Sequence, residues 1–340
     1  MVWPRLTIKR MRADLEDLHQ PYPLLALVGQ PELKTALLLG LINPGVGGVL
    51  ISGPFGVGKT TAVRSLLDLM PTLVRPPATS GGAPQREVMR LVELPLNARL
   101  EDVVGGINER VAIEQGRVLL EPGLLALADG NLLYVDEVNL LDAAVVDAIL
   151  DAAAQGRTLV RRGPMTRLFA SRFLLVGSMN PEEGELRPQI LDRFGLRVWV
   201  APLDDPMQRL EVYRRNQAFR ADPAAFRMLY APQTSALATE LEAARAMLPH
   251  VTIPPAVEAQ GMALVQALRI PSHRAEIALF EGARAHAAAD RRSQVACEDL
   301  RRVAPLALRQ RQSPHLEEHA RRQAVEQGVI MAAIEQILER

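Results

Sequence analysis

A run of eight residues with fixed glycines carries the clearest chemistry in this chain of 340 residues. It reads Gly53-Pro54-Phe55-Gly56-Val57-Gly58-Lys59-Thr60 and fits G-x-x-x-x-G-K-[ST] at every fixed position. In this pattern backbone N–H groups surround phosphates, the lysine reaches the β- and γ-phosphates, and the threonine hydroxyl binds Mg²⁺. An apolar segment precedes the run, and a helical pattern from Thr61 follows it. The sequence therefore predicts an ATP and Mg²⁺ site at residues 53–61, against the alternative of a simple glycine-rich turn.

Two adjacent carboxylates supply what a phosphate-binding loop still needs. The apolar residues 131–135 run directly into Asp136 and Glu137. We expect Asp136 to hold Mg²⁺ through water, and Glu137 to orient or deprotonate the attacking water. The alternative is that both residues only cap a helix that starts near Asn139.

A polar amide follows the next apolar strand. Residues 173–177 lead into Ser178-Met179-Asn180, and an amide at that point can orient water against the γ-phosphate. We therefore predict that Asn180 senses the phosphate. The alternative is an asparagine that only forms a turn before Pro181.

The elements that must position these residues alternate between strand and helix from Val28 to about Val200. This order is typical of βαβ units with a mostly parallel sheet, so we predict an α/β fold. Beyond Asp204 the periodicity is mainly helical, which predicts a second, all-α domain. We place the domains at residues 1–203 and 204–340. Strands are predicted at Val49–Ile51, Arg90–Glu93, Leu132–Val135, Phe173–Gly177 and Val198–Val200, and residues 71–85 are the most loop-like stretch.

The balance of charged residues limits the classes of binding partner that the sequence predicts. Lysine plus arginine and aspartate plus glutamate both number 39, so no net charge attracts nucleic acid or an anionic membrane, and neither is an expected partner. Cys297 is the only cysteine, which excludes an internal disulfide and a cysteine-based zinc site. No run of 18 apolar residues occurs. We expect a cytoplasmic protein.

The motifs together resemble a known family. The run from Asn180 to Gly195 is similar to the sensor 1 and arginine-finger region of AAA+ ATPases, and within them of the I subunits of magnesium chelatase. Tyr134 to Asp142 resembles their Walker B helix, and Glu121 to Ala126 also resembles this family. Val28-Gly29-Gln30 resembles the start of the AAA+ module, which implies that Val28 and Gly29 contact the nucleotide. The resemblance implies an AAA+ module followed by a smaller helical lid, and it weakens from Met207 onward.

Two arginines gain roles from this resemblance. Arg193 corresponds to the arginine finger, which enters the nucleotide site of the neighbouring subunit. Arg274, in Ser272-His273-Arg274, corresponds to the sensor 2 arginine of the helical domain. Each would bring a guanidinium near the phosphates, where it stabilises transition-state charge. The alternative for each is an ordinary salt bridge with a nearby acid.

Two segments resemble insertions of the same family. Residues 103–120 correspond to an insertion in helix 2, and residues 157–170 to a hairpin before sensor 1, with its turn at 162–164. The hairpin contains four arginines, which contact a partner, contact nucleic acid if the protein is a helicase-like relative, or form a solvated face.

The resemblance implies a homo-hexameric ring because a finger that acts on a neighbour leaves a lone subunit incomplete. It also implies an ATPase motor that works with a D-type subunit carrying an integrin-I-like domain and an H-type porphyrin-binding subunit, and that drives magnesium into protoporphyrin IX. A MoxR-like chaperone or remodelling ATPase with a different integrin-like partner is the alternative. A non-enzymatic nucleotide-binding scaffold is a third reading, which the intact Lys59, Asp136, Glu137, Asn180 and Arg193 disfavour.

Overall fold

Five parallel strands form the central sheet of the protein. The structure is a computed structural model that describes residues 20–75, 85–163 and 165–312. The strand order is β11-β1-β10-β7-β4, and every neighbouring pair is parallel. The strands are β1 (Val49–Ser52), β4 (Leu91–Leu94), β7 (Leu132–Val135), β10 (Leu174–Met179) and β11 (Leu196–Trp199).

The predicted α/β fold and its five strands are confirmed, with small shifts at the ends. Two ends shift by two residues: β10 ends at Met179 and not at Gly177, and β11 begins at Leu196 although the sequence predicts a start at Val198. Arg197 interrupts the apolar run there, yet it is 2% exposed because its guanidinium finds backbone acceptors inside the protein. The start of β11 was therefore missed because a charged residue, Arg197, is buried within the strand.

Alternate residues of the strands pack into two separate cores. Ile51, Tyr134 and Val176 face one core, while Leu50, Val135 and Leu175 face the other. Both faces of a parallel sheet are normally covered by helices, which explains why these strands are apolar throughout. The first core is covered by α2 (Pro31–Ile42) and α3 (Lys59–Arg64), and the second by α4 (Leu100–Val104), α6 (Leu124–Leu127) and α7 (Ala143–Gln155).

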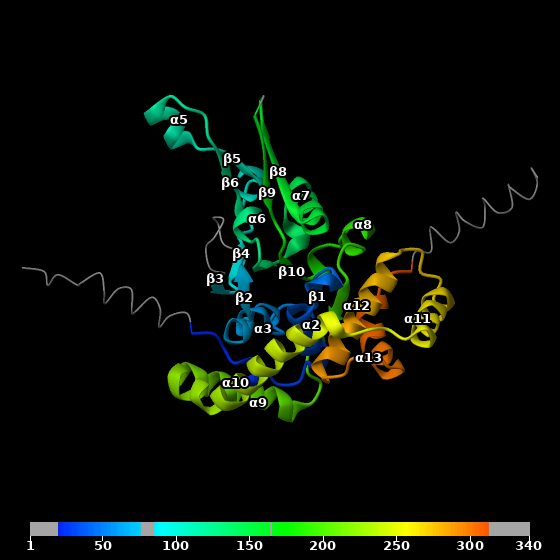
Figure 1. Ribbon diagram of the computed structural model, residues 1–340. Coiled ribbons are helices and arrows are strands. Elements are labelled where there is room, and N and C mark those ends of the chain that lie inside the picture. Colours follow the sequence, from blue (N-terminus) through cyan, green and yellow to red (C-terminus); the bar gives the residue numbers. More distant parts are fainter. Residues whose placement is uncertain (1–19, 76–84, 164, 313–340) are drawn as a thin grey trace, which may run out of the picture.

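Two antiparallel strand pairs project from the sheet (Figure 1). The first joins β5 (Gly105–Ile107) to β6 (Leu120–Pro122), with α5 (Glu109–Gln115) between them. The second joins β8 (Arg157–Arg162) to β9 (Met165–Ala170), in the range 157–170 where the sequence predicts a hairpin. The first insertion was expected at 103–120, but its strand pair runs from Gly105 to Pro122.

A third antiparallel pair corrects the prediction of a loop at residues 71–85. β2 (Thr72–Arg75) pairs with β3 (Gln85–Val88), so both ends of the predicted loop are strands. Residues 76–84 lie outside the described residues.

Apart from one isolated β-bridge between Thr252 and Gln294, only helices follow the sheet in the described part of the chain. All but the first of them contribute buried residues to the same core as α2 and β1, so the sheet and these helices share one apolar interior. The division at 203/204 stays a prediction. None of the described helices is both long enough and apolar enough to cross a membrane. The helices are α9 (Pro206–Ala221), α10 (Pro223–Met247), α11 (Pro255–Ala267), α12 (Arg274–Ala289) and α13 (Cys297–Leu308).

Short helical turns complete the described elements. They include α8 (Pro188–Leu191), between β10 and β11, and six 3₁₀ turns. These turns are η1 (Leu24–Ala26), η2 (Pro44–Val46), η3 (Ser65–Leu69), η4 (Val138–Leu140), η5 (Pro181–Glu183) and η6 (Leu248–His250).

Candidate active site

Three neighbouring strands deliver the predicted catalytic residues to one edge of the sheet. Ser52, the last residue of β1, pairs with Met179, the last residue of β10. Val135, which ends β7, pairs with Gly177 of β10. The glycine loop, the two carboxylates and Asn180 follow these strands directly. They meet because the carboxyl ends of parallel strands lie at the same edge, which is where ligands bind in open α/β sheets.

The glycine loop has the backbone shape of a phosphate cradle. Gly56 and Gly58 have φ angles of +73° and +86°, which side-chain-bearing residues rarely adopt. No atom lies within 4 Å of the position that a Cβ would take at either residue, so these glycines serve the conformation of the loop. α3 starts at Lys59, immediately after Gly58. Loop N–H groups and a helix start at this position suit an anionic ligand.

Asp136 is held by three hydroxyl groups. Thr60 Oγ1 donates to Asp136 Oδ2 at 3.0 Å, and the Tyr134 hydroxyl donates to Oδ1 at 2.8 Å. Ser178 Oγ also donates to Oδ1. Burial raises the pKa of Tyr134, so its hydroxyl keeps its proton and remains a donor. Thr60 and Asp136 thus lie in direct contact, as two residues that share one Mg²⁺ should.

Lys59 lies against its own loop. Its Nζ donates to the carbonyl oxygen of Pro54 at 3.0 Å and to that of Gly53. Burial lowers the pKa of Lys59, while the carboxylates of Asp136 and Glu137 oppose that shift. The Lys59 ammonium therefore binds the loop carbonyls, and a phosphate bound in the loop would replace these carbonyls as its partner.

Glu137 adopts a strained backbone at the end of β7. Its φ is +50°, one of five positive values among the described residues other than glycine. The Ser178 hydroxyl accepts a hydrogen bond from its backbone N–H at 3.1 Å, but its carboxylate caps no helix. Burial, together with the charges of Glu183 and Asp136, raises the pKa of Glu137. Strain and a raised pKa are typical of a catalytic carboxylate rather than of a capping residue.

Asn180 makes a turn contact with one side-chain atom and leaves the other without a partner. It is 1% exposed, and its Oδ1 accepts a hydrogen bond from the backbone N–H of Glu182 at 3.2 Å, which is the turn that the alternative predicted. Its Nδ2 has no partner among the described residues. A buried amide without an acceptor is costly. The free donor therefore fits a ligand oxygen at this edge of the sheet.

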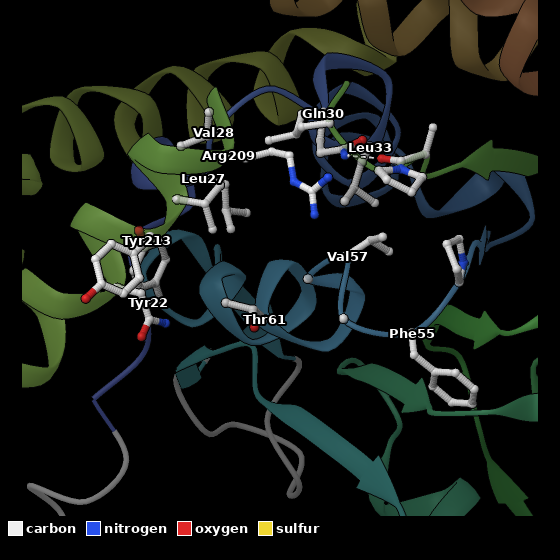
Figure 2. Close-up of a pocket in the computed structure, with 18 residues that line it drawn as sticks. Tyr22, Leu27, Val28, Gln30, Leu33, Phe55, Val57, Thr61, Arg209 and Tyr213 are labelled. Carbon is white, nitrogen blue, oxygen red and sulfur yellow. Dashed lines mark hydrogen bonds between the residues drawn. The ribbon is translucent and has the colours of Figure 1, made fainter. Parts of the chain in front are cut away.

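A cavity of about 680 Å³ adjoins the glycine loop and extends to the start of α9. Val28 and Leu33 line it together with Val57 and Thr61 (Figure 2). Gly29 does not line it. A Cβ there would lie 2.9 Å from Leu203 Cδ2, so Gly29 allows residues 201–203 to pack against the start of the module. Val28 thus lines the cavity, whereas Gly29 allows the close packing of residues 201–203 that form part of its wall.

Arg193 lies at the opposite edge of the sheet from the glycine loop. β11 begins at Leu196, which pairs with Val49 at the amino end of β1. A four-residue strand spans roughly 13 Å, so Arg193 is separated from its own glycine loop by the length of β1. Its Nη1 forms an ion pair with Asp151 Oδ1 of α7 at 2.7 Å. Within one subunit it is the salt-bridged residue that the alternative predicted.

Arg274 contacts Asp192, the residue before Arg193, and not the phosphate loop. It begins α12, and its Nη1 donates to Asp192 Oδ2 at 3.2 Å. The structure therefore places both predicted arginines at the amino edge, where the side chains of Arg193 and Arg274 are 31% and 48% exposed. Neither is near the subunit's own Lys59.

A buried arginine holds the segment around Arg193. The five N–H donors of Arg311 match five acceptors: the carbonyl oxygens of Ala307, Asp192, Phe194 and Gly195, and the Asp192 carboxylate at 2.8 Å. Its side chain is 0% exposed. The end of α13 and residues 192–195 are thereby joined.

Sequence reasoning missed Tyr134, Ser178 and Arg311. Tyr134 and Ser178 each precede a predicted site residue by two positions in a strand, so they lie on the same face as Asp136 and Asn180. That spacing could have identified them. Arg311 gives no such signal, because its five acceptors are brought to it only by the fold.

The residues at the carboxyl edge fit ATP and Mg²⁺. The glycine loop offers N–H donors, Thr60 and Asp136 offer oxygen ligands of the type that Mg²⁺ prefers, and Asn180 offers an unused buried donor. His286, Asp290 and Asp299 are the one converging ligand group among the described residues. Arg292 donates to both of their carboxylates, so this group is a salt-bridge cluster.

Known proteins similar to this chain point to one family. The family model for magnesium chelatase subunit ChlI matches residues 24–190, and that for the AAA lid domain matches residues 258–328. The chain is 41% identical over 312 residues to the magnesium-chelatase 38 kDa subunit of Acidiphilium rubrum, covering 85% of this chain and 90% of that protein.

Two further comparisons agree with this result. A magnesium-chelatase subunit ChlI homolog of Methanocaldococcus jannaschii is 39% identical over 334 residues, covering 91% of this chain and 90% of the relative. A solved candidate ATPase from Cytophaga hutchinsonii shares the fold, with a TM-score of 0.59 at 23% identity over 94% of this chain and 93% of its own. The chain therefore belongs to the magnesium chelatase ChlI family and is an AAA+ ATPase.

Proposed function

We propose that this ATPase is the motor subunit of a magnesium chelatase, which couples ATP hydrolysis to magnesium insertion into protoporphyrin IX in chlorophyll or bacteriochlorophyll biosynthesis. Relatives named as magnesium-chelatase subunits, matched over at least 85% of this chain, support the proposal. We further propose that chelation takes place on an H-type subunit. The support is that the His286, Asp290 and Asp299 group is already bound by the Arg292 guanidinium.

The arrangement at the carboxyl edge supports a hydrolytic role for each residue. Residues 53–61 would bind the phosphates, with Lys59 leaving the loop carbonyls for the β- and γ-phosphates. Thr60 and Asp136 would hold Mg²⁺, which neutralises charge that develops on the phosphate oxygens. Glu137 would accept a proton from the attacking water, and the Asn180 Nδ2 would orient that water or the γ-phosphate.

The location of the arginines supports a ring. Arg193 and Arg274 lie at the amino edge, so neither completes the site of its own subunit. In a closed head-to-tail ring the amino edge of one subunit can face the carboxyl edge of the next. We propose that both arginines act on the neighbour's ATP in a homo-hexamer, and that the Arg193–Asp151 ion pair opens when the ring closes.

The partners and compartment remain part of this proposal. We expect a D-type subunit with an integrin-I-like domain to bind the ring, and the H-type subunit to hold the porphyrin. The three subunits would meet in the cytoplasm.

A reconstituted chelation assay tests the function. The chain is combined with D- and H-type subunits, MgATP and protoporphyrin IX, and magnesium insertion is followed by the fluorescence of the product. We expect insertion with the wild type and none with Glu137→Gln. ATP turnover without insertion would contradict the chelatase role and favour the MoxR-like remodelling ATPase.

A further inference from the structure

An arginine of α9 lies in the cavity beside the glycine loop, and the mechanism above does not use it. Arg209 is in the first turn of α9 and lines the cavity together with Val57 and Thr61. Figure 2 shows its guanidinium pointing across the cavity toward the glycine loop, while Tyr22 and Tyr213 lie on the other side. The charged group therefore faces the end of the cavity where phosphates would bind.

Helix periodicity turns one face of α9 toward this cavity. Arg209, Val212, Tyr213 and Asn216 all line it, and they are spaced i, i+3, i+4 and i+7. Arg214 does not belong to this face and does not line the cavity. The position of Arg209 thus follows from the orientation of the whole helix.

Contacts on both sides of Arg209 hold α9 in this orientation. Before the helix, Gln30 Nε2 donates to the carbonyl oxygen of Ala201 at 2.7 Å. Farther along α9, Arg215 Nη1 donates to the carbonyl oxygen of Ala26 at 2.9 Å, and the ring of Phe219 packs edge-on against Tyr22. The turn that carries Arg209 is therefore fixed over the cavity before any ligand binds.

Arg209 differs from the other arginines around the site in having no partner. The guanidinium of Arg209 makes no hydrogen bond or ion pair with any residue that the structure describes. By contrast, Arg215 pairs with Glu211, and Arg227 pairs with Asp68. Arg274, the helical-domain arginine expected near a phosphate, is at the amino edge. Arg209 is thus the one cationic side chain that lines this cavity among the described residues, and Lys59 lies in the adjoining glycine loop.

We propose that Arg209 binds the phosphate chain of the nucleotide held by its own subunit. The inference rests on the proposed function, because it requires ATP or ADP in this cavity. A guanidinium forms paired, charge-assisted hydrogen bonds with phosphate oxygens, which suits it to this ligand better than to a base. Nucleotide binding then links α9 to the glycine loop, while Arg193 and Arg274 stay available for the neighbour.

Calorimetric titration of the full chain with MgADP tests the proposal. We expect Arg209→Ala to weaken binding by roughly tenfold or more, since charge-assisted hydrogen bonds are lost. Arg209→Lys should recover part of the affinity, and Arg209→Met, which keeps the apolar stem, should not. Arg214→Ala is the matched control on the same helix and should bind within about twofold of the wild type.

Two outcomes separate this inference from the proposed function. If Lys59→Ala weakens binding but Arg209→Ala or Arg209→Met binds like the wild type, the role of Arg209 is overturned and the phosphate loop stands. If Lys59→Ala itself binds like the wild type, the nucleotide site at residues 53–61 is wrong, and the role of Arg209 is lost with it.

Discussion

The carboxyl and amino edges of the central sheet differ in which side chains they carry and in how those side chains are paired. At the carboxyl edge Asp136 is surrounded by hydroxyl donors and Asn180 keeps a buried donor free, so the groups that we propose to bind ATP and activate water are already assembled. At the amino edge Arg193 and Arg274 are bound to carboxylates of their own subunit. The carboxyl edge has the proposed ATP-binding groups without Arg193 or Arg274, and the amino edge has these two cations without a phosphate.

This difference indicates why assembly would control hydrolysis. A charge that stabilises the transition state works only within a few ångströms, and the length of β1 keeps the two edges apart. A subunit alone would bind nucleotide without rapid turnover. Apposition of two subunits would then complete the reaction.

Glu137→Gln should give the largest effect, because it removes the proposed base and leaves the phosphate cradle intact. We expect ATP hydrolysis to fall by roughly 1000-fold while nucleotide binding persists. Phosphate release and calorimetric binding on the same preparation measure both quantities. Equal hydrolysis rates would show that the carboxyl edge does not use Glu137.

Arg193→Ala should lower hydrolysis by roughly 100-fold, since one donor to the developing charge is lost. Subunits that carry Arg193→Ala have an intact cradle, and subunits that carry Lys59→Ala have an intact finger. Mixing the two inactive variants should therefore restore part of the activity. Verified mixed rings without any recovery would place the finger in its own subunit and contradict the division between the edges.

Arg311→Met tests whether the amino edge is preassembled. The substitution leaves five acceptors without their donors, three of them buried, and we expect the free energy of unfolding to fall by roughly 3–5 kcal/mol. Urea denaturation measures the change. Arg301→Met is the matched control, because Arg301 pairs with Glu298 at the surface and should contribute at most about 1 kcal/mol. Similar losses for both variants would show that Arg311 does not hold residues 192–195.

Glu183→Gln should give the smallest effect, a shift of the acidic limb of the pH–rate profile. Burial and the Glu183 charge raise the pKa of Glu137, so the active carboxylate is lost at a higher pH than for an ordinary glutamate. Removing the Glu183 charge lowers that pKa, and the limb should move to lower pH. Glu182→Gln is the neighbouring control. If the acidic limb moved to higher pH or did not move, the limb would not report the protonation of Glu137.

The sequence predicted the carboxyl edge far better than the amino edge. Residues 53–60, Asp136 and Asn180 each follow an apolar strand, and parallel strands must align their ends. The sequence did not reveal where Arg274 would lie, because it stands 82 positions after Asp192 in the chain and no local pattern links the two. The cavity face of α9 was missed because the resemblance weakens from Met207 onward.

The sequence by itself determined the nucleotide chemistry and the order of strands and helices, since these depend on short motifs and on the period of apolar residues. Tertiary structure decided which groups share an edge. It joined Tyr134 and Ser178 to Asp136, separated Arg193 and Arg274 from their own phosphate loop, and turned Arg209 toward the cavity. The physical reason is that such contacts depend on how distant segments pack, and packing joins residues that no local spacing relates.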